Sequence, residues 1–115
     1  MIVYLATPYT HPDARIRQAR FEIANHVAAW IMRQGHSVFS PISHSHHIAE
    51  HLPDDLLLNH EFWMDQDLPL LRVCNALWVY PANAAQTSKG VVREIREAEA
   101  LGIPVRYVDE GEVWG

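Results

Sequence analysis

The chain has 115 residues, 49% of them hydrophobic and 20% charged, which is the size and composition of one globular domain with a core of its own. Its formal net charge is −5 with only nine lysines and arginines, which argues against a nucleic-acid polymer or an anionic membrane as the main partner. The single cysteine, Cys74, allows no internal disulfide. The first apolar run is too short for a signal peptide or a membrane span, so we expect a cytoplasmic protein.

The first forty residues have the pattern of a strand, a helix and a second strand. Residues 2–6 form a short apolar run, which is typical of a strand buried on both faces of a parallel sheet. Residues 36–40 predict a second strand. Between the two we expect a helix that Thr10 caps and Gly35 ends. Its apolar face should carry Ile16, Ala19, Ile23, Val27, Trp30 and Ile31.

The middle of the chain begins with a polar, histidine-rich segment over residues 41–53, for which we expect an irregular loop. A loop of this length is uncommon in a small domain unless it has a function. Residues 54–72 predict a helix that is interrupted near His60. Residues 74–80 predict a third buried strand.

The last part of the chain predicts a helix over residues 88–101, ended by Gly102, and a fourth strand over residues 103–108. Residues 109–115 can add a short strand at the edge of the sheet. Strands that alternate with helices are typical of an α/β domain. We therefore expect residues 1–115 to form a single Rossmann- or flavodoxin-like doubly wound sheet, with four to five mainly parallel strands and helices on both faces.

Doubly wound sheets bind ligands at the carboxyl ends of their strands, and the segment Ser88-Lys89-Gly90 opens a predicted helix there. The free backbone N–H groups and the dipole of a helix start favour an anion, and Gly90 permits close approach of the backbone. The alternative is an ordinary helix cap, because serine is among the residues preferred at that position. From this local pattern alone, the cap is the simpler interpretation.

Three other residues can lie near the same crevice: Tyr4 in the first strand, Asp67 near the end of the helix predicted over residues 54–72, and Glu94 six residues after Ser88. Surface exposure is the commoner outcome for helix carboxylates, and core packing is the simplest role for Tyr4. If Asp67 and Glu94 both face the crevice, they form a carboxylate pair suited to glycosyl-bond chemistry, with one nucleophile and one proton donor.

The histidines form the one unusual feature of the composition. Six of the eight lie between His36 and His60, and four of these are His44, His46, His47 and His51. Imidazole is a good ligand for zinc and other transition metals, but a specific spacing such as His-Glu-x-x-His is missing. We therefore expect ligand-binding or surface histidines, with no metal and no other cofactor. Cys74 lies on a predicted buried strand, which favours an inert core thiol over a nucleophile.

Four segments together carry a family resemblance: residues 2–9 (IVYLATPY), 39–46 (FSPISHSH), 67–79 and 88–94 (SKGVVRE). Over nearly its whole length, the chain resembles a family of small proteins known as a domain of unknown function (DUF1937), within the nucleoside 2-deoxyribosyltransferase-like superfamily. That superfamily includes deoxyribosyltransferases and 2'-deoxynucleoside 5'-monophosphate N-glycosidases.

The resemblance implies roles for particular residues. Glu94 matches the glutamate that attacks the anomeric carbon, Tyr4 matches its hydrogen-bond donor, and Asp67 matches the aspartate that assists the departing base. Transferases acting on free nucleosides have an aspartate where Ser88 lies, whereas the monophosphate glycosidases have a serine. A carboxylate repels phosphate and a serine at a helix start attracts it, so the resemblance implies a 5'-phosphorylated ligand. We also expect ligand contacts at Gly90, Thr7, Pro8, Tyr9, Arg17, His44 and His46.

Three functions follow from these residues. The first is an N-glycosidase or deoxyribosyltransferase with Glu94 as nucleophile, and the second is a nucleotide-binding module without turnover. The third is a hydrolase with a metal held by the histidines of residues 44–51. For the first two, the partner is a small nucleotide or nucleoside. Because a neighbouring subunit completes the site in the related enzymes, the resemblance also implies a homodimer or a larger homo-oligomer.

Overall fold

Four parallel strands form the centre of the molecule in the computed structural model, which describes residues 1–115. Their order across the sheet is β2-β1-β3-β4, and each neighbouring pair is parallel. The strands are β1 (Ile2–Ala6), β2 (Ser37–Phe39), β3 (Ala76–Val79) and β4 (Val105–Tyr107). The predicted doubly wound α/β fold is therefore confirmed, with four strands.

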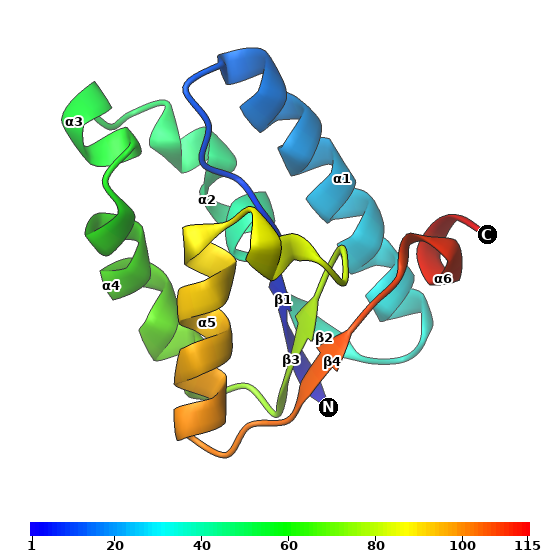
Figure 1. Ribbon diagram of the computed structural model, residues 1–115. Helices are drawn as coiled ribbons and strands as arrows, with labels where there is room; N and C mark the ends of the chain where they lie inside the picture. Colours follow the sequence, from blue (N-terminus) through cyan, green and yellow to red (C-terminus); the bar gives the residue numbers. More distant parts are fainter.

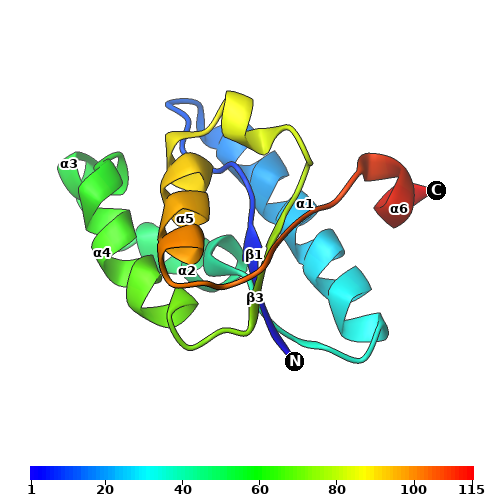
Figure 2. The ribbon, with the colours of Figure 1, turned by 60° about the horizontal axis from the view of Figure 1, so that its bottom comes forward.

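Helices cover both faces of this sheet (Figures 1 and 2). On one face lie α1 (Ala14–Arg33) and α6 (Glu110–Trp114), and on the other lie α4 (His60–Leu71) and α5 (Lys89–Ala100). The chain between β2 and α4 forms α2 (Pro41–Ala49) and the single turn α3 (Asp54–Leu57), and a 3-10 turn, η1 (Ala84–Gln86), precedes α5. No helix combines the length and the apolar character needed to cross a membrane.

The central strand β1 is apolar because helices bury it on both sides. Successive side chains of a strand point to opposite faces, so Val3 and Leu5 join the core beneath α1, whereas Tyr4 and Ala6 join the core beneath α4 and α5. Tyr4 is a polar residue in this position, and its hydroxyl group needs a partner on the α4–α5 side.

Residues 41–53 are not the irregular loop that their polar composition suggested, because Pro41–Ala49 form α2. Ser40 caps this helix by accepting a hydrogen bond from the Ser43 amide, and Pro41 occupies the first turn, where a missing N–H costs nothing. The side chains that α2 buries recur at helical spacing: Ile42, Ser45, His46 and Ala49. The Ser-Pro pair and the helical spacing of these residues are the features of the sequence that indicate a helix here.

The start and the buried face of α1 also differ from the expectation. Asp13, and not Thr10, caps the helix by accepting a hydrogen bond of 2.9 Å from the Arg15 amide. The predicted apolar face is buried only in its second half, and Ile16 and Ile23 are 37% and 41% exposed. A helix of 20 residues is about 30 Å long and a five-residue strand about 17 Å, so the first half of α1 extends beyond the sheet.

The expectation for the end of the chain was wrong, because Glu110–Trp114 form α6 instead of an edge strand. Asp109 and Glu112 satisfy each other's backbone N–H groups in a capping box that starts this helix. The interruption predicted near His60 is confirmed, since α3 ends at Leu57 and α4 begins at His60. Asn59 begins α4 by accepting a hydrogen bond from the Phe62 amide. The remaining strands and α5 lie within a few residues of their predicted bounds.

The strand order fixes where a ligand can bind. The chain winds from β1 to β2 on one side and from β3 to β4 on the other, so the winding reverses between β1 and β3. The segments that follow β1, β2 and β3 therefore meet at one edge of the sheet. This edge lies at the top of Figure 1, opposite the N-terminus, and the first turn of α5 lies beside it.

Candidate functional site

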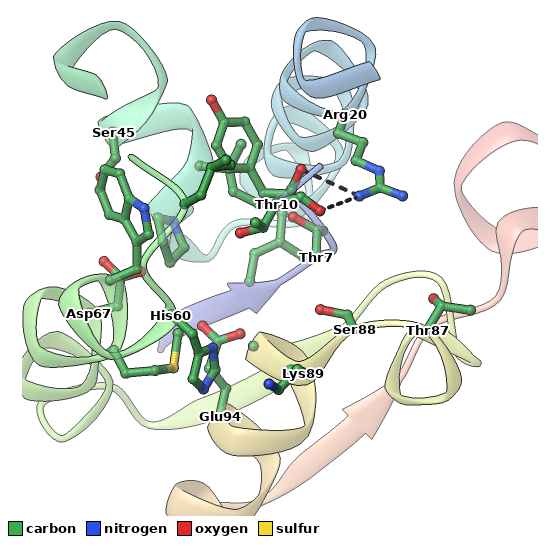
Figure 3. A pocket seen from close by; sticks show the side chains of 18 residues that line it. Thr7, Thr10, Arg20, Ser45, His60, Asp67, Thr87, Ser88, Lys89 and Glu94 are labelled. Atoms are coloured by element: carbon green, nitrogen blue, oxygen red, sulfur yellow. Dashed lines mark hydrogen bonds between the residues drawn. The ribbon is translucent and has the colours of Figure 1, made fainter. Parts of the chain in front are cut away.

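A cavity of about 330 Å³ opens at this edge of the sheet, and 18 residues line it. They come from the end of β1 and the loop after it, α1, the first half of α2, the inner face of α4 with Leu58 before it, and the start of α5 (Figure 3). Six of the predicted site residues are among them: Thr7, Tyr9, Asp67, Ser88, Gly90 and Glu94. The structure thus brings together residues from five separate segments of the sequence.

Glu94 lies on the buried face of α5, in the same row as Val91, Ile95 and Ala98. Its side chain is not the solvated carboxylate that a charged helix usually carries, because the residue is only 5% exposed. The hydroxyl group of Tyr4 donates a hydrogen bond to Glu94 Oε2. The strand register that points Tyr4 toward α5 therefore positions the carboxyl group at the floor of the cavity.

Asp67 lies on the inner face of α4, between Met64 and Leu68, and is 7% exposed. Its Oδ1 atom has no hydrogen-bond partner, and neither has the hydroxyl group of Thr7 at the end of β1. Buried polar atoms in proteins are nearly always paired, because leaving one unpaired costs about 1–3 kcal/mol. Two unpaired groups that line one cavity are the arrangement expected where a polar ligand supplies the missing partners.

Burial raises the pKa of both carboxyl groups. Loss of hydration raises the pKa of Asp67 to about 7. It raises the pKa of Glu94 to about 8, where the Tyr4 hydrogen bond acts in the opposite direction and the charge of Asp67 adds to the increase. Between these two values the pair holds roughly one proton. Burial and the nearby Glu94 also raise the pKa of Tyr4 well above its ordinary value, so its hydroxyl group stays a donor.

Ser88, at the start of α5, is both a helix cap and a residue of the cavity, so the two interpretations of its sequence position are compatible. Its hydroxyl group caps the helix by accepting a hydrogen bond of 3.2 Å from the Val91 amide, and the residue also lines the cavity. The amides of Lys89 and Gly90 make no hydrogen bond within the protein, so they are free to bind an anion. A Cβ atom on Gly90 would lie 3.7 Å from Met64 Cε, which is an ordinary contact, so packing against α4 does not by itself require glycine here.

A cation that the sequence did not single out, Arg20, lines the cavity. Its guanidinium group donates hydrogen bonds to the carbonyl oxygens of Tyr9 and Thr10, as Figure 3 shows. Arg17, the predicted anion ligand, instead donates to the carbonyl oxygens of His11 and Pro12 and lies outside the lining. The two arginines are three residues apart on α1, so periodicity alone could not tell which one faces the ligand.

Neither of the two predicted histidines, His44 and His46, lines the cavity. His46 is buried, its Nδ1 atom lies 2.7 Å from the Tyr9 hydroxyl oxygen, and its Nε2 atom lies 2.9 Å from Gln18 Oε1. His46 therefore positions Tyr9, which does line the cavity. His44 is exposed and its neighbour Ser45 takes the lining position.

Pro8 lies outside this lining as well, in a separate hollow beside Trp114. That hollow lies between the loop after β1 and α6, and it shares Thr7 and Arg20 with the main cavity.

Four apolar side chains form the wall of the cavity beside Asp67, and they are Ile42, Leu58, Trp63 and Met64. The indole N–H of Trp63 is already bound to the carbonyl oxygen of Leu57, so its ring presents only apolar surface. Such a wall suits a flat, partly apolar group. Neither Trp63 nor His60 was among the residues expected at the site, and His60 lines the cavity one turn before Met64.

Three residues that could together hold a metal ion lie at the end of α2, but hydrogen bonds within the protein already occupy one of them, His46. Ligand atoms of His46, His47 and Glu50 lie within 4.8 Å of one another. Both ring nitrogens of His46 are hydrogen-bonded, however, and burial lowers the pKa of this histidine. A metal would have to displace Tyr9 or Gln18, and the cluster includes no residue of the cavity lining.

The raised pKa of Glu94 makes a prediction about stability. Its value of about 8 lies above the ordinary 4.5, so the stability linked to the neutral form is complete below pH 4.5 and is lost as the pH rises through about 8. Glu94→Gln keeps an oxygen that accepts from Tyr4 but cannot ionise. We expect the variant and the wild type to melt at similar temperatures at about pH 5, and the variant to melt higher at about pH 9, by on the order of 5 °C.

Thermal denaturation at the two pH values checks this expectation. Glu99→Gln is the matched control, because Glu99 is exposed on the same helix and its variant should show no such pH-dependent difference. A Glu94→Gln effect that is the same at both pH values would contradict the raised pKa.

A known family covers the elements that form this cavity. The family model described as "Domain of unknown function (DUF1937)" matches residues 1–110. Among curated proteins, none matches the chain. The family match extends from β1 to the first residue of α6, so the chain belongs to the family of the domain of unknown function DUF1937.

Proposed function

We propose that the protein cleaves the N-glycosidic bond of 2'-deoxynucleoside 5'-monophosphates, either by hydrolysis or by transfer of the sugar to another base. The observation that carries the proposal is the pairing of two buried carboxyl groups, Asp67 and Glu94, in a cavity that also holds the open N-terminus of α5. Glycosyl chemistry uses such a carboxyl pair. The helix start provides the anion site for the 5'-phosphate.

In the proposed reaction, Glu94 is the nucleophile. An oxygen of its carboxylate attacks C1', the bond between C1' and the base nitrogen breaks, and Asp67 transfers its proton to the departing base. Water then attacks C1' and releases Glu94, and the proton of the water returns to Asp67. In the transfer reaction, the nitrogen of a second base takes the place of water. Tyr4 holds Glu94 at one angle throughout.

The two ends of the cavity match the two ends of this substrate. Ser88, the free amides of Lys89 and Gly90, and the guanidinium group of Arg20 would hold the phosphate. The apolar wall around Trp63 would receive the base, with Asp67 at its edge. The unpaired oxygen of Asp67 and the unpaired hydroxyl group of Thr7 would then gain partners from the ligand.

One observation favours a second candidate, a nucleotide-binding module without turnover. The pKa of Glu94 is raised to about 8, so in the free protein at pH 7 this carboxyl group is mostly neutral, and a neutral carboxyl group is a poor nucleophile. A module of this kind would be stabilised by nucleotides in proportion to RT ln(1 + [L]/Kd) and would release no base.

Base release from a panel of 2'-deoxynucleoside 5'-monophosphates, followed by chromatography, separates the two candidates. We expect release by the wild type, a loss of at least about 10³-fold in Glu94→Gln, and a loss of about 10²–10⁴-fold in Asp67→Asn, because each variant removes a group that acts only in the transition state. Glu99→Gln should retain full activity. Stabilisation by nucleotides without base release in the wild type would favour the binding module.

The substitution Ser88→Asp tests the phosphate site without removing the helix cap, since aspartate caps helices as well as serine does. We expect circular dichroism and melting temperature to be nearly unchanged. The KM for a monophosphate should rise by at least about tenfold, because a carboxylate at this position repels the phosphate. An unchanged KM would show that the phosphate binds elsewhere.

The pH dependence of kcat/KM tests the shared proton of the carboxyl pair. The reaction needs Glu94 ionised and Asp67 protonated, so the pair must hold one proton, as it does between about pH 7 and about 8. Because this proton lies mostly on Glu94, the reactive form is the less populated of the two one-proton arrangements. We expect a bell-shaped profile that falls below about 7, where both groups are protonated, and above about 8, where both are ionised. A profile that is flat between about pH 5 and 9 would contradict this assignment.

A further inference from the structure

A second hollow, of about 600 Å³, adjoins the phosphate end of the main cavity. The two share His60, Thr87, Ser88 and Lys89, which Figure 3 shows at the start of α5 and opposite it. The second hollow continues from there along the outer side of α5 and ends at Arg96. We call it the basic groove. The proposed reaction uses only the end of the groove at Ser88 and Lys89, and it assigns no role to the rest.

The charge of the groove is opposite to that of the molecule. The chain carries 14 acidic residues against nine lysines and arginines, yet three of those nine, Lys89, Arg93 and Arg96, line this one hollow. On α5 they occupy positions i, i+4 and i+7, which share one side of a helix and extend about 10 Å along its axis. The only acidic residue in the lining is Glu61.

Most of this positive charge has no partner within the protein. Lys89 and Arg96 are exposed and form no ion pair. Arg93 lies 3.3 Å from Glu61, whose side chain is 66% exposed, and an exposed pair of this kind is weak enough for another anion to replace Glu61. A row of cations that starts at an open helix N-terminus is suited to an anion longer than one phosphate group.

From these contacts we infer that the site takes ligands with a phosphate chain, a nucleoside 5'-diphosphate or triphosphate, in preference to a monophosphate. The α-phosphate would lie at the amides of Lys89 and Gly90, and the following phosphates would lie over Lys89 toward Arg93 and Arg96. The nucleoside part of this ligand rests on the proposed function. The preference for a phosphate chain rests on the basic groove alone.

The test measures dissociation constants by calorimetry at constant ionic strength. Inorganic phosphate, pyrophosphate and tripolyphosphate probe the groove without a nucleoside, and 2'-deoxyadenosine and 2'-deoxycytidine mono- and diphosphates probe the whole ligand. We expect pyrophosphate and the diphosphates to bind at least about tenfold more tightly than phosphate and the monophosphates, as one added charge-assisted contact would give.

Variants then assign the preference to the groove. Arg96→Gln and Arg93→Gln should each reduce it severalfold and leave monophosphate binding unchanged, whereas Glu61→Gln should increase it by freeing Arg93. Arg33→Gln is the control for total charge, since Arg33 is exposed at the far end of α1, and it should change nothing. Equal affinity for phosphate and pyrophosphate, or a preference that survives loss of both arginines, would overturn the inference.

The outcomes also separate this inference from the proposed function. If monophosphates release base but the wild type shows no preference for a longer phosphate chain, the glycosidase proposal stands and the basic groove has no such role. If pyrophosphate binds in a manner that depends on Arg93 and Arg96 while no nucleotide releases base, the groove binds phosphate chains and the glycosidase proposal fails.

Discussion

The hydrogen bond between the Tyr4 hydroxyl group and the Glu94 carboxyl group joins the central strand of the sheet to the helix that carries the anion site. Because both residues are buried, water cannot readily replace either partner of this hydrogen bond. Tyr4 can reach Glu94 only because β1 points it to the α4–α5 face, and Glu94 can receive it only because α5 is packed by Val91, Ile95 and Ala98. The site is therefore an extension of the core beneath α4 and α5.

This arrangement places an energetic cost inside the fold. Two carboxyl groups are buried without a cation to neutralise them, and one of their oxygens has no partner. A core of apolar residues would be more stable at the same positions. Groups held in so unfavourable a state are characteristic of functional sites, where a ligand supplies what the fold omits. The free amides at the start of α5 are a second set of polar groups that have no hydrogen-bond partner within the protein.

The sequence predicted most reliably those elements whose signal was local. The apolar run over residues 2–6 matches the bounds of β1 to the residue, and Ser88 caps α5 as its position before the predicted helix indicated. It failed for α2, where three histidines and two serines suggested a loop, and for α6, where a short edge strand was expected and an acidic capping box starts a helix instead. In both cases the sequence contains a helix-start motif, Ser-Pro before α2 and Asp-x-x-Glu at α6, but the polar composition of the segment favoured another prediction.

For the site, the sequence identified the residue types but not the way each one faces. Glu94, Asp67 and Ser88 do line one cavity, whereas the choice of Arg17 over Arg20 depended on the rotation of α1 against the sheet, which burial decides and periodicity does not. The raised pKa values of the two carboxyl groups depend on how deeply the packing of α4 and α5 against the sheet buries them. The pattern of residues along the chain does not predict that depth of burial.

The alternation of side chains along β1 has a consequence for how this protein can diverge. Deleting or inserting one residue within Ile2–Ala6 would turn Tyr4 to the α1 face and place an aliphatic side chain against Glu94. The turns at Gly35 and Gly102 lie at the opposite edge of the sheet from the cavity, so changes of length there would leave the site in place. New ligand preferences should thus arise in lineages through the loops and α2, while the length of the first strand stays fixed.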